Sequence, residues 1–196
     1  AATSSFCQAA ATACSVAGLG CHLLLPGEAA ERAPANLVLA EECGAQIGYT
    51  GRPRHQLDGL VQEHARALSA ASGHPALGVP RGGASDVGAL GFVLAAAELH
   101  DQLRALGVTE ARIVIAVGSG GSVSGLLVGL ARLGLHWSVT GVSVSRPLPG
   151  LEEHLRSLVS ACAARAGTDD PGTRALTLLA PRGEPHGAAH LDELAC

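Results

Sequence analysis

The chain has 196 residues, enough for one large domain or two small ones, and 47% of them are hydrophobic. Its formal charge of −4 and the lack of a basic stripe argue against binding to nucleic acids or anionic membranes. No apolar run reaches the ~18 residues of a membrane-spanning helix, and no basic segment at the start suggests a secretory signal. We therefore expect a cytoplasmic protein whose six cysteines are reduced structural thiols.

Helix and strand patterns alternate along the chain. Amphipathic or small-residue stretches predict helices at residues 6–17, 34–43, 56–71, 87–106, 123–133 and 150–165. Short apolar or β-branched runs predict strands at residues 21–25, 46–49, 76–79, 112–117, 138–145 and 175–179. Such alternation is typical of β-α-β units, so we predict an α/β fold with parallel sheets flanked by helices.

Two lobes are expected, because the loop Pro80–Ser85 and the long helix after it look like a crossover. The first is a small lobe over residues 1–79, built from parallel β-α-β units. The second covers residues 80–196 and carries a glycine-rich loop.

That loop, Gly118-Ser-Gly-Gly-Ser122, is the most informative segment of the chain. It follows the run Arg112–Val117, whose β-branched residues are typical of a parallel strand covered on both faces. It also leads into a predicted helix of small residues. Several backbone N–H groups and hydroxyls would then point to one spot beside a helix N-terminus, which is an arrangement that binds phosphate.

The kind of phosphate is narrowed by the basic residues, because all 13 are arginines and the chain contains no lysine. A nucleotide P-loop needs a lysine, so that motif is excluded. A dinucleotide-binding loop is possible: Gly118 and Gly120 supply two of its three glycines, and Arg146 could meet the 2′-phosphate of NADP. A compact turn of this kind also suits the single phosphate of pyridoxal 5′-phosphate (PLP).

Four segments in register resemble the D-cysteine desulfhydrase and 1-aminocyclopropane-1-carboxylate deaminase family of fold-type II PLP enzymes. They are Asn36–Ile47, Gly82–Val93, Gly118–Leu126 and Gly141–Arg146, and the likeness covers roughly residues 1–165. The resemblance implies a two-lobed fold like that of tryptophan synthase β, truncated here. It also implies PLP as cofactor, a small amino acid as substrate, and a lyase or deaminase reaction.

The resemblance also assigns roles to individual residues. It implies that the cofactor phosphate is bound by Gly118, Ser119, Gly120, Gly121 and Ser122. It places Ser4 against the substrate, and Ser5 where an asparagine of the family contacts the pyridine hydroxyl.

No catalytic residue follows from the likeness, because the family lysine that holds PLP lies upstream of the segment that Thr3–Phe6 matches. PLP chemistry starts from that lysine, so we expect non-covalent cofactor binding at best and no turnover by the chain alone. The chain could be a fragment of a competent enzyme, or a degenerate homologue. It could also be a subunit that dimerises or is completed by another chain. A non-catalytic binding or assembly protein is the alternative from another class.

Several histidines invite a second interpretation that we do not favour. His186 and His190 stand four residues apart with Glu193 nearby, which on a helix could bind a metal, but Gly187 weakens that helix and a solvated tail is the simpler interpretation. His22 and His64 are predicted to be structural or surface residues. No metal site is therefore predicted.

Overall fold

The computed structural model describes residues 4–29, 32–144 and 147–180. It divides into two compact units, unit 1 up to Gly82 and unit 2 from Gly83 onward. Each unit has its own parallel sheet and its own buried core. Among the helices that the structure describes, none combines the length and apolar character needed to cross a membrane.

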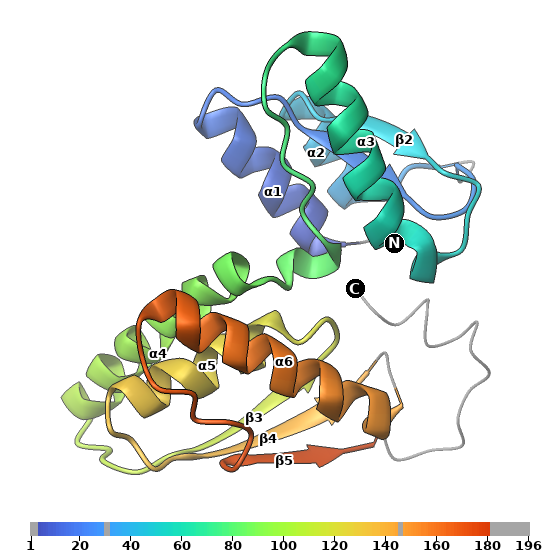
Figure 1. The fold of residues 1–196 in the computed structure, drawn as a ribbon. Helices are drawn as coiled ribbons and strands as arrows, with labels where there is room; N and C mark the ends of the chain where they lie inside the picture. The colour runs from blue at the N-terminus through green and yellow to red at the C-terminus, as the bar shows by residue number, and fades with distance from the viewer. Residues whose placement is uncertain (1–3, 30–31, 145–146, 181–196) are drawn as a thin grey trace. The chain divides into compact units, whose positions relative to one another are not determined.

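Unit 1 contains a two-stranded parallel sheet with three helices (Figure 1). Its helices are α1 (Ser5–Val16), α2 (Ala35–Glu42) and α3 (Leu57–Ser72). Its strands are β1 (His22–Leu25) and β2 (Gln46–Tyr49), paired with His22 opposite Gln46. Short 3-10 turns lie at Arg54–Gln56 and at Arg81–Gly83, the latter spanning the unit boundary.

The core of unit 1 is small. Four buried residues form it: Ala11, Leu23, Ala40 and Ala45. Cys7, Cys21 and Cys43 pack against them. Burial raises the pKa of the Cys21 thiol to about 11, and the neighbouring thiols of Cys14 and Cys7 raise it further. The five cysteines within the described residues all carry free thiols.

Helix α3 turns its apolar stripe inward, with Leu57 and Ala65 buried. His64 belongs to the same stripe, and its Nε2 lies 3.5 Å from Nδ1 of His22 at the start of β1. The two rings are tilted, with their centroids 5.4 Å apart. These two histidines thus contact each other.

The predicted strand at residues 76–79 is wrong, because this segment pairs with no strand. Side chains of α3 take its backbone hydrogen bonds instead. Gln62 Nε2 donates to the Gly78 carbonyl at 2.9 Å, and the Ser69 hydroxyl accepts from the Ala76 N–H at 2.8 Å. Leu77 is 87% exposed, so this apolar run contributes nothing to a core.

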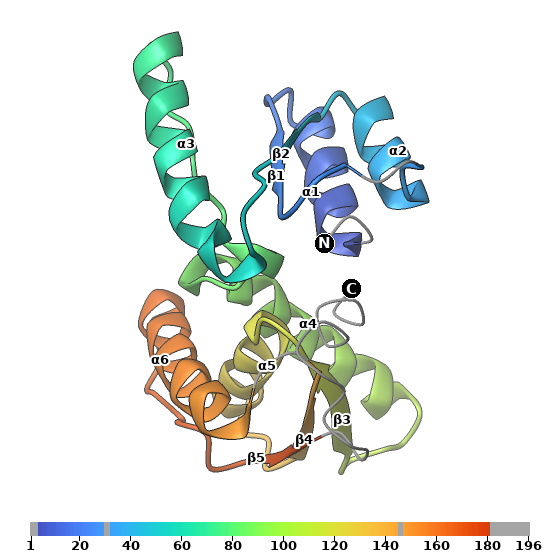
Figure 2. The same cartoon turned by 90° about the vertical axis from the view of Figure 1, so that its right-hand side faces the viewer.

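Unit 2 contains a three-stranded parallel sheet in the order β3-β4-β5 (Figure 2). Its strands are β3 (Arg112–Val117), β4 (Ser138–Ser143) and β5 (Leu176–Leu179). Its helices are α4 (Asp86–Ala105), α5 (Gly121–Arg132) and α6 (Leu148–Ala166). Strand β4 ends at Ser143, two residues earlier than predicted.

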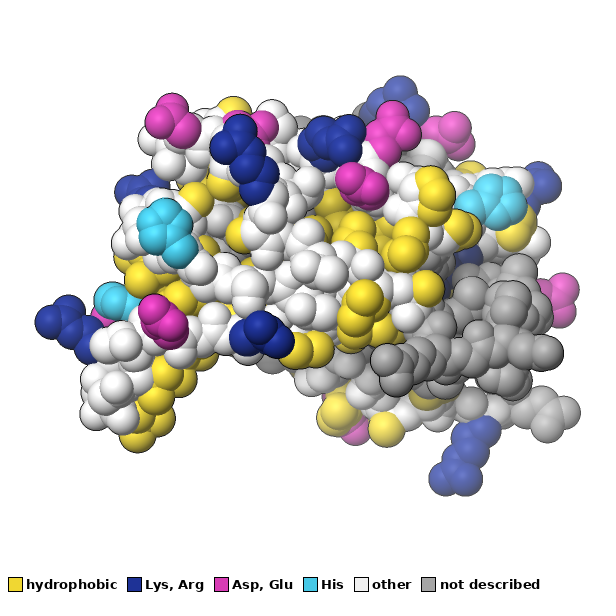
Figure 3. Space-filling view, turned by 90° about the horizontal axis from the view of Figure 1, so that it is seen from below, with side chains coloured by type: hydrophobic (Ala, Val, Ile, Leu, Met, Phe, Trp, Pro, Cys, Tyr) yellow, Lys and Arg dark blue, Asp and Glu magenta, His cyan; other side chains and the backbone are white. Residues whose placement is uncertain are grey.

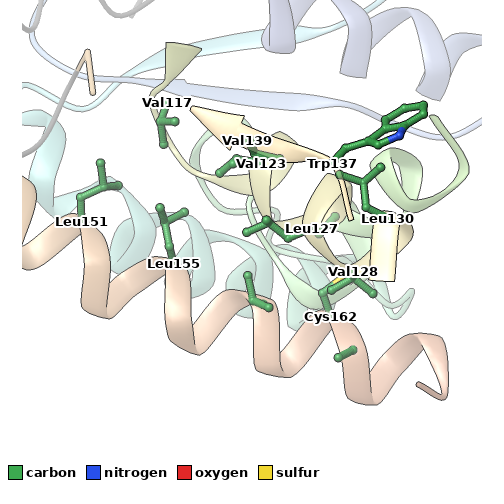
Figure 4. Close-up of a cluster of buried hydrophobic side chains, with 13 residues drawn as sticks. Val117, Val123, Leu127, Val128, Leu130, Trp137, Val139, Leu151, Leu155 and Cys162 are labelled. Carbon is green, nitrogen blue, oxygen red and sulfur yellow. The ribbon is translucent and has the colours of Figure 1, made fainter. Parts of the chain in front are cut away.

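The helices of unit 2 enclose an apolar core against the sheet (Figure 4). Its buried residues come from the strands, α5 and α6, and include Val117, Val139, Val123, Leu127, Val128, Leu151, Leu155 and Cys162. Helices α4 and α5 approach so closely that a Cβ on Gly125 would meet the Ala89 carbonyl and the Phe92 side chain. Small residues at this contact let the two helix backbones approach each other.

The prediction that residues 112–117 are covered on both faces is wrong for the part of the chain described here. Helices α4, α5 and α6 all lie on one side of the sheet (Figure 1), over Ile113 and Ile115. On the other side Val114 is 67% exposed and Leu179 is 47% exposed. Figure 3 shows hydrophobic side chains gathered on the face seen from this side. We call this surface the open sheet face.

Candidate functional site

The glycine-rich loop lies at the carboxyl ends of the strands of unit 2. Strand β3 ends at Val117 and α5 begins at Gly121, so Gly118–Gly120 form the connection. The Val144 N–H donates to the Val117 carbonyl at 3.1 Å, which holds the end of β3 beside the chain leaving β4. Loops at this edge of an open parallel sheet are the usual ligand sites of α/β folds.

Helix α5 starts inside the predicted loop, because it begins at Gly121 and not at Val123. Gly120 is the N-cap residue, with φ +96° and ψ −11°. Its carbonyl already accepts the Ser124 N–H at 3.0 Å. A positive φ of this kind is accessible to glycine and costs other residues strain, so Gly120 is what turns the chain into the helix.

The early start of α5 places hydrogen-bond donors in the loop. The N–H groups of a first helical turn have no acceptor within the helix, which here concerns Gly121, Ser122 and Val123. Gly120 has no side chain that could cap them. The helix dipole adds a partial positive charge at the same end. With the half-buried Ser122 hydroxyl, these N–H groups can bind an anion.

Helix α6 forms the back of the loop. His154 Nε2 donates a hydrogen bond of 2.8 Å to the Ser119 carbonyl. A Cβ on Gly120 would lie 2.6 Å from Leu155 Cδ2, so glycine is needed there for close approach as well as for its φ. Leu155 is fully buried, which fixes this part of α6. The sequence analysis missed His154, because a single histidine on a helix surface carries no signal of its partner.

Helix α4 supports the loop from another side. A Cβ on Gly121 would lie 3.4 Å from the Cα of Ala84, just before α4. Ser85 caps α4 by accepting the Gly88 N–H at 3.1 Å. Asp86 follows and pairs with Arg165 of α6 at 2.6 Å. The hydrogen bonds from Arg165 hold the pKa of the Asp86 carboxyl below its usual value.

One buried polar atom has no partner. Among the described residues, the Ser124 hydroxyl is fully buried without a hydrogen bond. It lies on α5 one turn after Gly120. An unpaired buried hydroxyl lowers stability, since it has given up its bonds to water.

Ser4 and Ser5 belong to unit 1, whereas the glycine-rich loop belongs to unit 2. Ser4 is the N-cap of α1, and its hydroxyl oxygen accepts the Cys7 N–H at 3.4 Å. Ser5 is the first residue of that helix. The structure therefore brings Gly118–Ser122 together at one site and Ser4 with Ser5 at another.

The residues present fit a phosphate group but offer nothing to a cofactor aldehyde, because none of the 196 residues is a lysine. No group of three or more histidine, cysteine, aspartate or glutamate residues that could hold a metal lies within residues 4–29, 32–144 and 147–180. His186, His190 and Glu193 lie outside the described residues.

Comparisons with known proteins agree with this geometry. The sequence pattern of a family described as pyridoxal-phosphate dependent enzymes matches residues 1–184. A putative 1-aminocyclopropane-1-carboxylate deaminase of Pyrococcus abyssi is 36% identical over 143 residues, which are 72% of this chain and 42% of that protein. D-cysteine desulfhydrase of Serratia proteamaculans is 38% identical over 89 residues, which are 43% of this chain and 27% of that enzyme.

A solved structure of a homologue of the same deaminase superposes on this chain with a TM-score of 0.80 at 27% sequence identity. The match covers 94% of this chain and 56% of the other. The chain thus spans little more than half of that structure and less than half of either curated relative.

Proposed function

Because the chain belongs to the pyridoxal-phosphate dependent enzyme family, we propose that Gly118–Ser122 hold the phosphate of that family's cofactor. The predicted likeness to the deaminase and desulfhydrase group is confirmed, as is the α/β fold of the fold-type II class. The observation that supports the phosphate site best is the left-handed Gly120 followed by the first-turn N–H groups of α5.

The reaction we infer is that of a lyase or deaminase acting on a small amino acid. The relatives are named for 1-aminocyclopropane-1-carboxylate and for D-cysteine, both small amino acids. When bound, PLP supplies an electron sink that stabilises negative charge on the substrate. In this chain the loop binds and orients the phosphate, which fixes where the rest of the cofactor lies.

Ser4 and Ser5 are proposed to face the substrate and the pyridine ring. The Ser4 oxygen accepts a bond from Cys7, but its hydroxyl hydrogen can still donate to a ligand.

The residue that holds the cofactor covalently has to come from outside these 196 residues, since they contain no lysine. We therefore propose that this chain binds PLP non-covalently and does not turn over amino acids by itself. It would act within a longer protein, or with a partner chain that supplies the lysine.

Two substitutions at one position test the phosphate site. Ser122→Asp puts a negative charge into the loop while favouring the helix N-terminus, so the fold should be retained. Ser122→Asn has nearly the same shape without the charge. We expect wild type and Ser122→Asn to bind PLP in equilibrium dialysis, with inorganic phosphate competing, and Ser122→Asp to lose at least ~10-fold in affinity. Equal PLP affinity in all three proteins would show that the phosphate binds elsewhere.

A non-catalytic assembly protein is the second candidate, favoured by the open sheet face with Val114 and Leu179 exposed. On this view the apolar surface is covered by a second copy or a completing chain. Analytical ultracentrifugation would show self-association, and PLP would not change the sedimentation. Turnover of D-cysteine by the isolated chain would contradict both this candidate and the inactivity proposed above.

A further inference from the structure

His154 is the one side chain in the described structure shown to donate to the glycine-rich loop from another element. Its Nε2 donates to the Ser119 carbonyl at 2.8 Å, in a half-buried position. It stands between Leu151 and Leu155 in sequence, and both of these are fully buried. The backbone that carries the histidine is therefore fixed against the core of unit 2.

The bond to Ser119 also determines the direction of a neighbouring donor. The carbonyl of Ser119 and the N–H of Gly120 belong to one peptide unit, which is planar and trans, so they point in opposite directions. Because His154 holds the carbonyl toward α6, the Gly120 N–H points away from α6.

Glycine at position 120 makes this control necessary. A flip of the peptide between Ser119 and Gly120 changes ψ of the first residue and φ of the second. Gly120 has φ +96° here, but a glycine adopts either sign of φ with similar ease. Without His154 the same peptide could turn its carbonyl oxygen toward a bound anion, which would repel it.

We propose that His154 is a positioning residue of the loop, which holds the Ser119–Gly120 peptide so that the Gly120 N–H can bond a phosphate group. The inference rests on the proposed function of the loop and adds to it a residue from α6. The histidine acts through a hydrogen bond from Nε2, so a neutral donor of similar length should replace it.

The test compares His154→Ala with His154→Gln in the full chain. Glutamine Nε2–H reaches about as far as the histidine Nε2–H and keeps the donor, whereas alanine removes it. Glu153→Ala, at an exposed position of the same helix, serves as a matched control. PLP affinity by equilibrium dialysis should fall about tenfold in His154→Ala. It should return to within about threefold of wild type in His154→Gln and stay unchanged in Glu153→Ala.

Backbone amide NMR with inorganic phosphate separates this inference from the proposed function. In wild type the amide signals of Gly120, Ser122 and Val123 should all move on addition of phosphate. In His154→Ala the Gly120 signal should no longer move while the other two still do. If no amide of the loop moves in wild type, the proposed function fails and the inference with it. If Gly120 responds equally in wild type and His154→Ala, or if glutamine does not rescue, the inference is wrong while the phosphate site stands.

Discussion

The two parallel sheets differ in how much core supports them. The sheet of unit 1 has two strands over four buried residues, three of them alanines. The sheet of unit 2 has three strands over a buried cluster of thirteen residues. The loop that we assign to phosphate therefore stands on the better-packed unit, whereas Ser4 and Ser5 start a helix over the smaller core. Rigid support is where a preorganised anion site requires it.

Gly125→Ala should have the largest effect on this difference, because it strikes the packing of unit 2. The new Cβ would overlap the Ala89 carbonyl and the Phe92 side chain, which forces α5 away from α4. We expect a loss of about 3 kcal/mol or more in the free energy of unfolding, measured by urea denaturation followed by circular dichroism.

Gly91→Ala is the control on the same pair of helices, because a Cβ at Gly91 meets nothing within 4 Å. It should leave stability unchanged or raise it by up to about 1 kcal/mol through helix propensity. Similar losses for the two alanine variants would mean that the α4–α5 contact is looser than described.

Leu37→Ala tests whether the two units open independently. Leu37 of α2 is 1% exposed, and its truncation should cost unit 1 about 2 to 3 kcal/mol. Hydrogen exchange read by mass spectrometry should show faster exchange in peptides of unit 1 and little change in unit 2. Leu151→Ala, at a fully buried position of α6, should give the reverse pattern. Uniform acceleration in both units by either variant would show one cooperative structure.

Asp86→Asn probes the ion pair between α4 and α6 through its pH dependence. The hydrogen bonds from Arg165 hold the pKa of Asp86 below the ordinary value of 3.8, so the charged form stabilises the folded state. That contribution is present above about pH 4 and is lost as pH falls through the lower folded pKa. The urea midpoint of wild type should exceed that of Asp86→Asn at neutral pH, and the gap should close below pH 4. A gap independent of pH would contradict the pairing.

Ser124→Ala should have the smallest effect, and of the opposite sign. The hydroxyl it removes is buried and unpaired among the described residues, so its loss should raise the free energy of unfolding by up to about 1 kcal/mol. Thermal melting measures the change. A clear loss of stability would mean that a water molecule or another group satisfies this hydroxyl.

The features that the sequence predicted correctly have local causes. Glycines after helices, the β-branched run before Gly118 and the apolar stripe of α3 each fix a structure from neighbouring residues alone. What failed depends on distant partners. Ala76–Val79 has strand-like residues, but its backbone bonds to α3. The bond from His154 to Ser119 joins residues 35 positions apart, and no local pattern announces it.

The start of α5 illustrates the same limit within the site. The glycine-rich loop was predicted, yet Gly121 and Ser122 turned out to be helical. The cause is the conformation of Gly120, which backs onto Leu155 of a later helix. Residue types were enough to locate the anion site, and contacts across the sheet were needed to define its donors.

The open sheet face also bears on how the protein behaves in solution. Val114 and Leu179 present aliphatic carbon to water, while Thr140 and Thr177 of the neighbouring strands place hydroxyls between them. Salts such as ammonium sulfate strengthen the burial of such surface, so the purified chain should precipitate at low concentrations of this salt. Replacing Val114 by threonine would extend the row of hydroxyls across all three strands and should keep the protein dissolved at a higher salt concentration.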